Sequence, residues 1–211
     1  PRHSRRRSPP PIRRRAYKPL RFLLHLLSMI AVAIVVGFGL SYYALGDGRL
    51  FGALRVGPWL AWPAIGATAP DPYTRAYLAR SGVLPLGQGE GVTFTAGSDS
   101  EGRPLDRACR YRIEGTTPPA GFWTLQAVSL EGENIAPPGM QMALQSRHVQ
   151  RASDGSLLLY VSRSLAPDNW LEISGNGRFK LILTLYAPSD ISGSGFSVDT
   201  LPSIIRERCA A

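Results

Sequence analysis

Histidine and cysteine, which often act in catalysis or metal binding, are scarce in this chain, and His148 is the main candidate for such a role. It is the only histidine in the C-terminal part, because the other two are His3 and His25. A metal site built from several histidines is therefore excluded, and a Ser-His-Asp triad would have to use His148 as its base. Since Arg147 and Arg151 lie close to it in the sequence, we expect His148 at an exposed strand edge.

Carboxylates and sequence motifs do not indicate a reaction either. The acidic residues between Glu90 and Asp190 could supply the paired carboxylates of a glycosidase, but their spacing selects no pair. The phosphate-binding patterns G-x-x-x-x-G-K-[ST] and G-x-G-x-x-G and the nucleophile pattern G-x-S-x-G do not occur. We therefore predict no catalytic residue, no metal ligand and no cofactor, and an enzymatic activity stays an open alternative.

A small set of aromatic and polar residues is the best candidate for contact with a ligand or partner, because such surfaces recognise carbohydrates and proteins. The set is Trp123, His148, Arg151, Asn169, Trp170 and Tyr186. Packing inside the fold is the alternative for the tryptophans, and Asn169 could instead hydrogen-bond the turn that it occupies. A basic run formed by Arg107, Arg110 and Arg112 has two interpretations as well, since it could face an acidic partner or solvent.

These residues follow an apolar segment, residues 22–45, that contains no charged side chain. As a helix, 24 residues extend about 36 Å, which exceeds the roughly 30 Å of a bilayer core. We predict a single transmembrane α-helix that acts as a signal anchor. A cleaved signal peptide is the alternative, but it needs a shorter apolar core and a small-x-small site directly after it. Twin-arginine export is a further alternative, suggested by the arginine pairs.

The net charge of +9 has one source, a basic tail at residues 1–21 that holds nine Lys and Arg and no acid. Residues 22–211 carry 15 charges of each sign, so we expect no nucleic acid partner. The positive-inside rule places the tail in the cytoplasm and the C-terminal part in the periplasm of a bacterial inner membrane. The tail should remain extended and solvated, or should contact anionic lipid head groups or a cytoplasmic partner.

Two features of the sequence indicate a contact with another membrane helix and a covalent link within the chain. Gly37 and Ser41 form a small-xxx-small pair, which either lets another membrane helix approach or simply faces lipid. Cys109 and Cys209 lie in the part predicted to be in an oxidising compartment, so we predict a disulfide between them. Two free thiols are the alternative, and a catalytic cysteine lacks a nearby histidine.

The remaining elements follow from periodicity and turn residues. Residues 46–83 are expected to be a juxtamembrane linker with a short helix between Asp71 and Gly82. Residues 84–211 should form an antiparallel β-sandwich of jelly-roll type, because apolar residues alternate with polar ones in short runs. The runs are residues 92–96, 109–113, 122–130, 140–150, 156–162 and 179–185. Asp154 and Gly155 predict a type I′ hairpin turn.

Four motifs resemble, in this order, the bacterial domain of unknown function 1214. They are GFWTL at 121–125, DGSL at 154–157, NWL at 169–171 and FKLILTLYAP at 179–188. The resemblance implies a β-rich, jelly-roll-like domain with no established reaction, often found with a companion domain of unknown function 1254. This chain has Glu172 where the family has a proline, and a membrane segment takes the place of the companion domain.

Together these observations predict a mainly β domain behind a single transmembrane helix. The function we expect is that of an inner-membrane accessory or scaffold protein without catalysis, which binds other membrane protein subunits or an envelope partner. The alternative is a periplasmic glycan-binding or hydrolytic envelope enzyme, which would need a concave polar pocket lined by carboxylates or His148.

Overall fold

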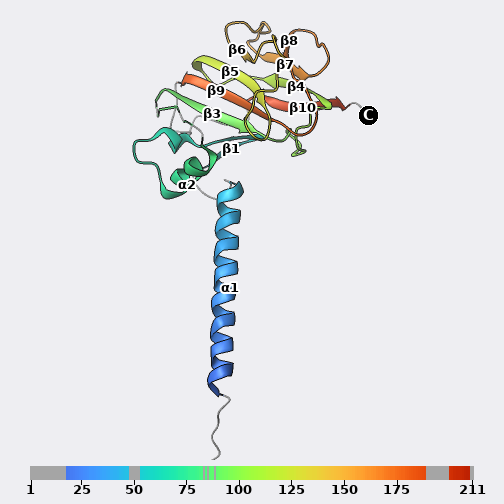
Figure 1. The fold of residues 1–211 in the computed structure, drawn as a ribbon. Coiled ribbons are helices and arrows are strands. Elements are labelled where there is room, and N and C mark those ends of the chain that lie inside the picture. The colour runs from blue at the N-terminus through green and yellow to red at the C-terminus, as the bar shows by residue number, and fades with distance from the viewer. Residues whose placement is uncertain are drawn as a thin grey trace, which may run out of the picture. The chain divides into compact units, whose positions relative to one another are not determined.

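A computed structural model of the chain describes residues 18–47, 53–82, 84, 86–87, 89–188 and 200–209. The chain divides into two compact units, Pro1–Asp47 and Gly48–Ala211. The first is a single helix in its described part, and the second contains the strands (Figure 1). The predicted basic tail lies outside the described residues except for its last four positions, 18–21.

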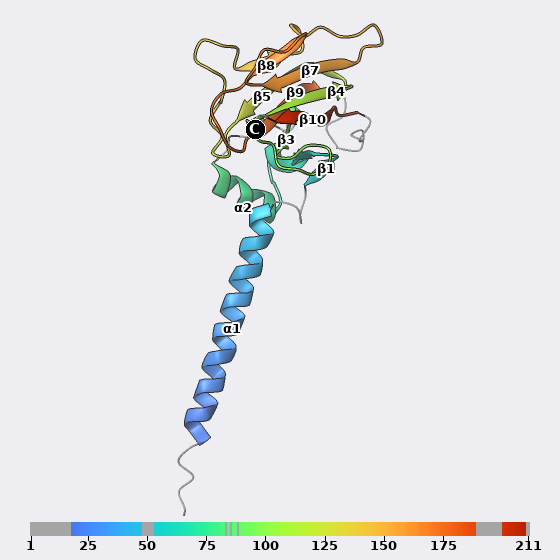
Figure 2. The ribbon, with the colours of Figure 1, turned by 90° about the vertical axis from the view of Figure 1, so that its right-hand side faces the viewer.

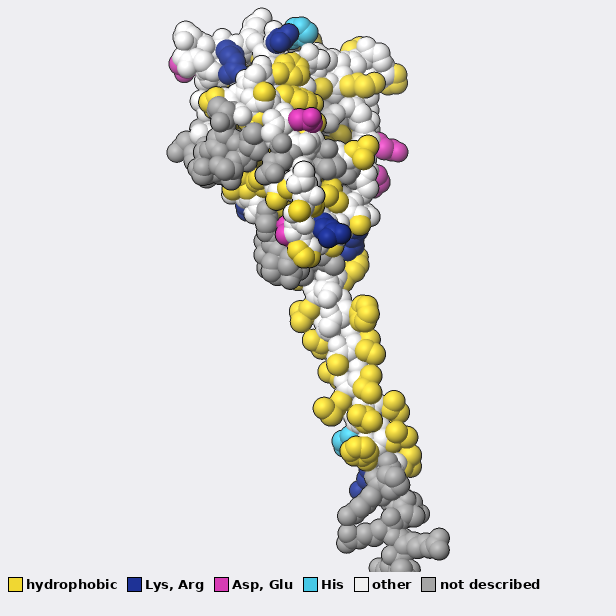
Figure 3. All heavy atoms as spheres, turned by 90° about the vertical axis from the view of Figure 1, so that its left-hand side faces the viewer, with side chains coloured by type: hydrophobic (Ala, Val, Ile, Leu, Met, Phe, Trp, Pro, Cys, Tyr) yellow, Lys and Arg dark blue, Asp and Glu magenta, His cyan; other side chains and the backbone are white. Residues whose placement is uncertain are grey.

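The helix α1, Lys18–Asp47, confirms the expected apolar helix and extends it by four residues at its start and two at its end. Its apolar window, Leu20–Tyr43, has a mean hydropathy of 2.5, and every residue in that window is exposed. Hydrophobic side chains cover its surface (Figure 3). A helix that is apolar on all sides has the composition of a membrane-spanning segment or of a signal sequence.

The β unit consists of two sheets (Figures 1 and 2). The six-stranded sheet has the order β1, Leu54–Val56; β2, Trp59–Ala61; β3, Gly91–Ala96; β9, Lys180–Pro188; β5, Ala120–Val128; β6, Ala143–Gln145. The four-stranded sheet has the order β10, Ser203–Cys209; β4, Cys109–Gly115; β7, Leu157–Ser162; β8, Asn169–Glu172. All neighbours are antiparallel except β7 and β8, which are parallel.

Both sheets bury one face in a common core, which confirms the mainly β prediction. Residues alternate between buried and partly exposed positions along β4 and along most of β5 and β9, as a strand with one inward face requires. Phe94 and Leu183 from the six-stranded sheet and Tyr111 and Leu159 from the four-stranded sheet belong to the same buried cluster. The Tyr111 ring meets the ring of Phe179 edge to face at 5.7 Å between centroids.

The predicted linker is wrong for its first part, because β1 and β2 are strands of the six-stranded sheet and β2 pairs with β3. Trp59 is fully buried, and its indole N–H donates to the carbonyl of Pro202 at 2.7 Å. The domain therefore begins well before residue 84. Strands of three residues are too short to show an alternating period, so tertiary pairing decides them.

The short helix of this region is confirmed as α2, Pro72–Ser81, which follows the single-turn helix η1, Pro63–Gly66. The side chain of Asp71 caps α2, because its Oδ1 accepts the backbone N–H of Thr74 at 3.1 Å. The ring of Tyr77 stacks on that of Trp62 with 4.2 Å between centroids. The helix therefore packs on the segment that leads from β2.

One predicted strand is much shorter in the structure, and two strands were not predicted. The run at 140–150 contains only the short strand β6, while β8 and β10 are strands that the periodicity did not indicate. The turn before β7 is present, but of its two central residues only Gly155 has a positive φ, +81°. A type I′ turn needs positive φ at both, so the turn is of another type.

Candidate functional site

The six candidate contact residues do not gather into one site. Trp123 lies on β5 with only 2% of its surface exposed, so packing in the core accounts for it. Asn169 is also buried, and its amide accepts from the N–H of Gln150 at 2.7 Å and donates to the carbonyls of Gln150 and Leu158, both at 2.8 Å. Asn169 therefore joins the preceding loop to β7, which is a structural role.

The remaining candidates lie at separate positions. The indole N–H of Trp170 donates to Ser162 at 3.2 Å. His148 and Arg151 are exposed, and the Arg151 guanidinium donates to the carbonyl of Gly155 at 3.0 Å. The ring of Tyr186 meets that of Phe122 at 5.7 Å between centroids. None of these side chains lines either of the two clefts of the β unit described below.

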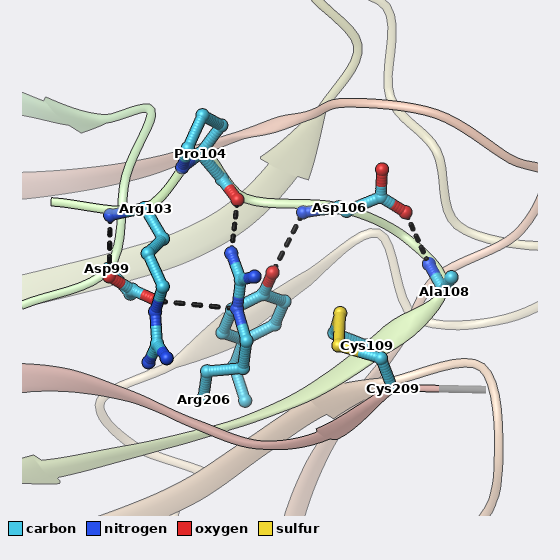
Figure 4. Close-up of a disulfide and its surroundings, with 9 residues drawn as sticks. Asp99, Arg103, Pro104, Asp106, Ala108, Cys109, Arg206 and Cys209 are labelled. Atoms are coloured by element: carbon cyan, nitrogen blue, oxygen red, sulfur yellow. Dashed lines mark hydrogen bonds and ion pairs between the residues drawn. A yellow bond between two sulfur atoms is a disulfide. The ribbon is translucent and has the colours of Figure 1, made fainter. Parts of the chain in front are cut away.

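A buried carboxylate, Asp99, organises the loop that precedes β4 (Figure 4). It accepts the backbone N–H groups of Glu101 at 3.1 Å and of Arg103 at 2.9 Å. It also forms ion pairs with the Nε atoms of Arg103 at 2.9 Å and of Arg206 at 3.3 Å. Because every partner belongs to the loop or to β10, the carboxylate holds two segments together and has no free position for a substrate.

Tyr111 extends this cluster towards the core. Its hydroxyl accepts the backbone N–H of Asp106 at 2.8 Å, and the guanidinium of Arg206 lies over its ring at 5.6 Å. Arg206 also donates to the carbonyl of Pro104. Burial raises the pKa of the Tyr111 phenol, although the hydrogen bond from Asp106 acts in the opposite direction. A neutral phenol that accepts a backbone N–H is a packing element.

The predicted disulfide between Cys109 and Cys209 is present (Figure 4). A bulge in β10 sets the pairing of that strand with β4 at this place. Arg206 is opposite Tyr111, but Arg208 is opposite Arg110 and Cys209 is opposite Cys109. One residue of β10, Glu207, is thus left over. Its carboxylate lies 3.5 Å from the guanidinium of Arg112. The bulge brings the two cysteines into register and also places two arginines opposite each other.

Beside the disulfide lies a cleft of about 510 Å³ that we call the arginine cleft. Its charged side chains all carry the same sign, and serine hydroxyls and the disulfide complete it. It is lined by Arg107, Ala108, Cys109, Arg110, Ser162, Arg163, Ser164, Arg208 and Cys209. The residues come from the start of β4, the end of β10 and the loop after β7, so three separate chain segments form it.

Neutral acceptors position these arginines. Arg110 donates to the carbonyl of Leu165 at 2.9 Å and to the hydroxyl of Ser164 at 3.2 Å. Arg107 donates to the carbonyl of Ser174 at 3.3 Å, and Arg163 donates to the side-chain carbonyl of Asn176 at 2.9 Å. These bonds orient the guanidinium groups without neutralising their charge.

The chemistry available in the arginine cleft is binding. Guanidinium groups donate hydrogen bonds but do not lose a proton in proteins, so they cannot act as general bases. Among the described residues no group of three or more His, Cys, Asp or Glu side chains could hold a metal ion. Among the described residues that line the cleft there is no histidine or carboxylate to activate Ser162 or Ser164.

A second cleft, of about 160 Å³, lies between α2 and the six-stranded sheet. Apolar side chains line most of it, including Trp62, Val92 and Ile182. Tyr77 also lines this cleft and is half-buried, and burial raises the pKa of its phenol. The cleft therefore offers apolar contact and little charge.

Sequence reasoning noted the basic run at Arg107, Arg110 and Arg112 but missed the cleft. A usable signal was present, because Arg110 follows Cys109 and Arg208 precedes Cys209. Once the two cysteines are assumed to be bonded, their neighbours must be close as well. The contribution of Arg163 had no such signal, since it depends on how the loop after β7 folds.

Comparison with protein families finds a match, at residues 90–190, to a model described as "Protein of unknown function (DUF1214)". These residues contain the four motifs quoted from the sequence. Among proteins with curated functions, none matches this chain.

Two solved structures are similar to part of this chain. The VPA0106 protein from Vibrio parahaemolyticus is 20% identical, with a TM-score of 0.53, over 66% of this chain and 36% of that one. An uncharacterized protein from Burkholderia cenocepacia is 17% identical, with a TM-score of 0.44, over 70% of this chain and 47% of that one. The first likeness shows a shared fold, and this chain spans less than half the length of either protein.

Proposed function

Since this chain belongs, through residues 90–190, to the DUF1214 family of unknown function, we propose its role from its own geometry. It is a membrane-anchored accessory protein without catalysis. Its helix crosses the bacterial inner membrane once, with the basic tail in the cytoplasm. Its β unit lies in the periplasm and binds a membrane complex or another envelope partner.

The observation that carries this proposal is the exposure of the apolar helix α1. No residue of the window Leu20–Tyr43 is buried, although large apolar side chains occupy most of it. In water such a surface would be strongly unfavourable, at about 25 cal/mol for each Å² of apolar area. A bilayer removes that cost, and a length of 24 residues suits its hydrocarbon core.

Two features of the β unit support the remaining parts of the proposal. The disulfide between Cys109 and Cys209 favours an oxidising compartment such as the periplasm. The polar clusters described above favour binding, because Asp99 is saturated by structural partners and the described lining of the arginine cleft includes no base. The basic residues before α1 favour a cytoplasmic tail by the positive-inside rule.

Topology tests this proposal directly. The full-length protein with a C-terminal tag is expressed, and protease is added to intact spheroplasts. We expect loss of the tag while a cytoplasmic marker protein stays intact. After a wash with alkaline carbonate the protein should remain in the membrane pellet. Its measured mass should be that of a chain that still contains α1. Protection of the tag contradicts the orientation, and a soluble product without α1 contradicts the anchor.

The helix is proposed to dock against another membrane helix at a shallow groove of about 480 Å³ that contains Gly37 and Ser41. A Cβ added at Gly37 would have no atom within 4 Å, so a larger residue fits sterically and would fill the groove. Exchanging Gly37 and Ser41 for leucine should therefore remove co-purifying membrane proteins in mild detergent. Val35→Leu, outside this groove, is the control. An unchanged set of co-purifying chains counts against docking at this face.

A further inference from the structure

We infer that the arginine cleft is a binding site for a phosphate dianion, carried either by a soluble molecule or by a lipid head group. The inference does not depend on which side of the membrane the β unit occupies. Four guanidinium groups line the cleft, from Arg107, Arg110, Arg163 and Arg208. No carboxylate of the described residues lies within ion-pair distance of any of them, because the described ion pairs involve Arg103, Arg112 and Arg206.

The first argument is the position of Arg208 opposite Arg110 on neighbouring strands. The β10 bulge creates this register, and the adjacent disulfide between Cys109 and Cys209 maintains it. Like charges directly opposite each other on two strands are destabilising. Without the bulge, Glu207 would face Arg110 and neutralise it. An anion bound between the two guanidinium groups would offset the repulsion between Arg110 and Arg208.

The second argument is a contrast among the buried arginine nitrogens. Four Nε atoms are buried without a hydrogen-bond acceptor in the described part of the chain, those of Arg107, Arg110, Arg112 and Arg206. The Nε atoms of Arg112 and Arg206 lie 3.5 Å and 3.3 Å from carboxylate oxygens, which compensates their charge. No carboxylate of the described residues lies within ion-pair distance of Arg107 or Arg110, and both line the cleft. A buried N–H donor without an acceptor is costly unless a ligand supplies one.

The third argument is that the cleft is organised in advance. Backbone carbonyls and hydroxyls hold Arg107 and Arg110, so binding an anion would lose little side-chain entropy. Gly175 makes room for one of them. Its φ is +77°, and a Cβ at this position would lie 2.8 Å from Nη1 of Arg107. A side chain there would have to displace the guanidinium from its place.

The ligand chemistry follows from charge and geometry. A phosphate monoester carries a charge of about −1.5 to −2 near neutral pH and has three acceptor oxygens, so it can accept from several guanidinium forks at once. A single carboxylate brings one charge and two oxygens, and it would leave most of the cleft uncompensated. The cleft volume of about 510 Å³ exceeds that of one phosphate group, so an attached organic group can enter as well.

The test uses the full-length protein in a non-ionic detergent and measures binding of glycerol 1-phosphate by calorimetry at constant ionic strength. The cleft variant combines Arg110→Gln with Arg208→Gln, and the control combines Arg55→Gln with Arg75→Gln, which are exposed and outside the cleft. We expect at least about a tenfold loss of affinity in the cleft variant and none in the control. Equal affinity of the cleft variant and the wild type overturns the proposal.

Folding of the cleft variant is checked separately by its unfolding midpoint without ligand. Removing two like charges should leave that midpoint unchanged or raise it, because the repulsion between strands disappears. Should the midpoint fall, the single variant Arg163→Gln replaces it. This side chain is exposed and lies in a loop, so its loss should weaken phosphate binding several-fold without affecting folding.

Two further probes distinguish the source of the phosphate. Short-chain phosphatidic acid that binds more tightly than glycerol 1-phosphate assigns the site to a lipid head group, and the reverse order assigns it to a soluble phosphate. Malonate, a dicarboxylate, is the chemical control. Malonate binding as tight as that of both phosphates overturns the assignment to phosphate.

Discussion

Asp99 has only 2% of its surface exposed, and its carboxylate still shows no feature of a catalytic group, because its partners are all structural. It receives two backbone N–H groups and two guanidinium groups. A buried charge of this kind stabilises a fold only while its partners remain, since desolvation of the carboxylate is already costly. Its arrangement distinguishes a structural acid from a functional one more clearly than its residue type does.

Replacing Asp99 by asparagine should therefore destabilise the β unit by about 2 to 3 kcal/mol, because Arg206 loses its counter-charge in a largely buried place. Chemical denaturation measures the free energy of unfolding. Glu101→Gln is the matched control, since Glu101 pairs with Arg103 at 2.8 Å but is mostly exposed, and it should cost less than about 1 kcal/mol. Equal losses in the two variants would show that burial of Asp99 does not matter.

Tyr111 links stability to alkaline pH. Burial raises the pKa of its phenol above the usual 10.0, so the folded chain holds the proton more firmly than the unfolded chain does. This contribution is fully present below about pH 10 and is lost as pH rises through the raised pKa. We expect the unfolding midpoint of the wild type to fall above about pH 10 more steeply than that of Tyr111→Phe. Parallel pH profiles of the two proteins would contradict this.

In strand β10, a single extra residue determines which side chains lie at the candidate site. Leaving Glu207 out of the ladder places Cys209 opposite Cys109 and Arg208 opposite Arg110. The same strand carries Arg206, which reaches Asp99 and lies over Tyr111. The disulfide, the ion pair between Arg206 and Asp99 and one side of the arginine cleft thus depend on one pairing between β10 and β4.

Removing the disulfide tests that dependence. In the chain-entropy model a closed loop of about 100 residues contributes up to about 4.7 kcal/mol to stability. Cys109→Ala with Cys209→Ala should lower the free energy of unfolding by a few kcal/mol in urea denaturation. A reducing agent should destabilise the wild type and leave the variant unaffected. A variant as stable as the oxidised wild type would show that the strand pairing alone holds the end of β10.

At the scale of the whole chain, the two units differ in where their apolar side chains lie. The β unit has its own buried core drawn from both sheets, and α1 has exposed apolar side chains throughout its window. The unit boundary at residues 47 and 48 separates the two. A core that uses no residue of α1 should not need the helix in order to fold.

We therefore expect a chain shortened to residues 48–211 to be folded in water. Its unfolding midpoint, followed by circular dichroism, should lie within about 2 °C of that of the β unit in the full-length protein. Detergent at the same concentration serves both samples, so that the solvent is matched. A shortened chain that aggregates or unfolds at a clearly lower temperature would show that α1 contributes to the core.

The sequence by itself determined the features that depend on neighbouring residues. The apolar helix follows from composition over one continuous segment, and α2 follows from the acid, proline and glycine that mark its ends. The mainly β class follows from alternation along each longer strand, and the family motifs at residues 90–190 are contiguous as well. Each of these properties is local, because the periodicity of side chains and the residues that mark helix ends act within a few residues.

Only the tertiary structure decided the features that depend on pairing between distant segments. It added β1 and β2 to a sheet, buried Trp123 and Asn169 that the sequence left open as contact residues, and placed Arg163 in the arginine cleft. The register of β10 against β4 joins residues about 100 positions apart, and one bulged residue shifts it. Hydrogen bonds between strands and packing in the shared core set that register. Both involve two distant segments, so the register cannot be predicted from either segment alone.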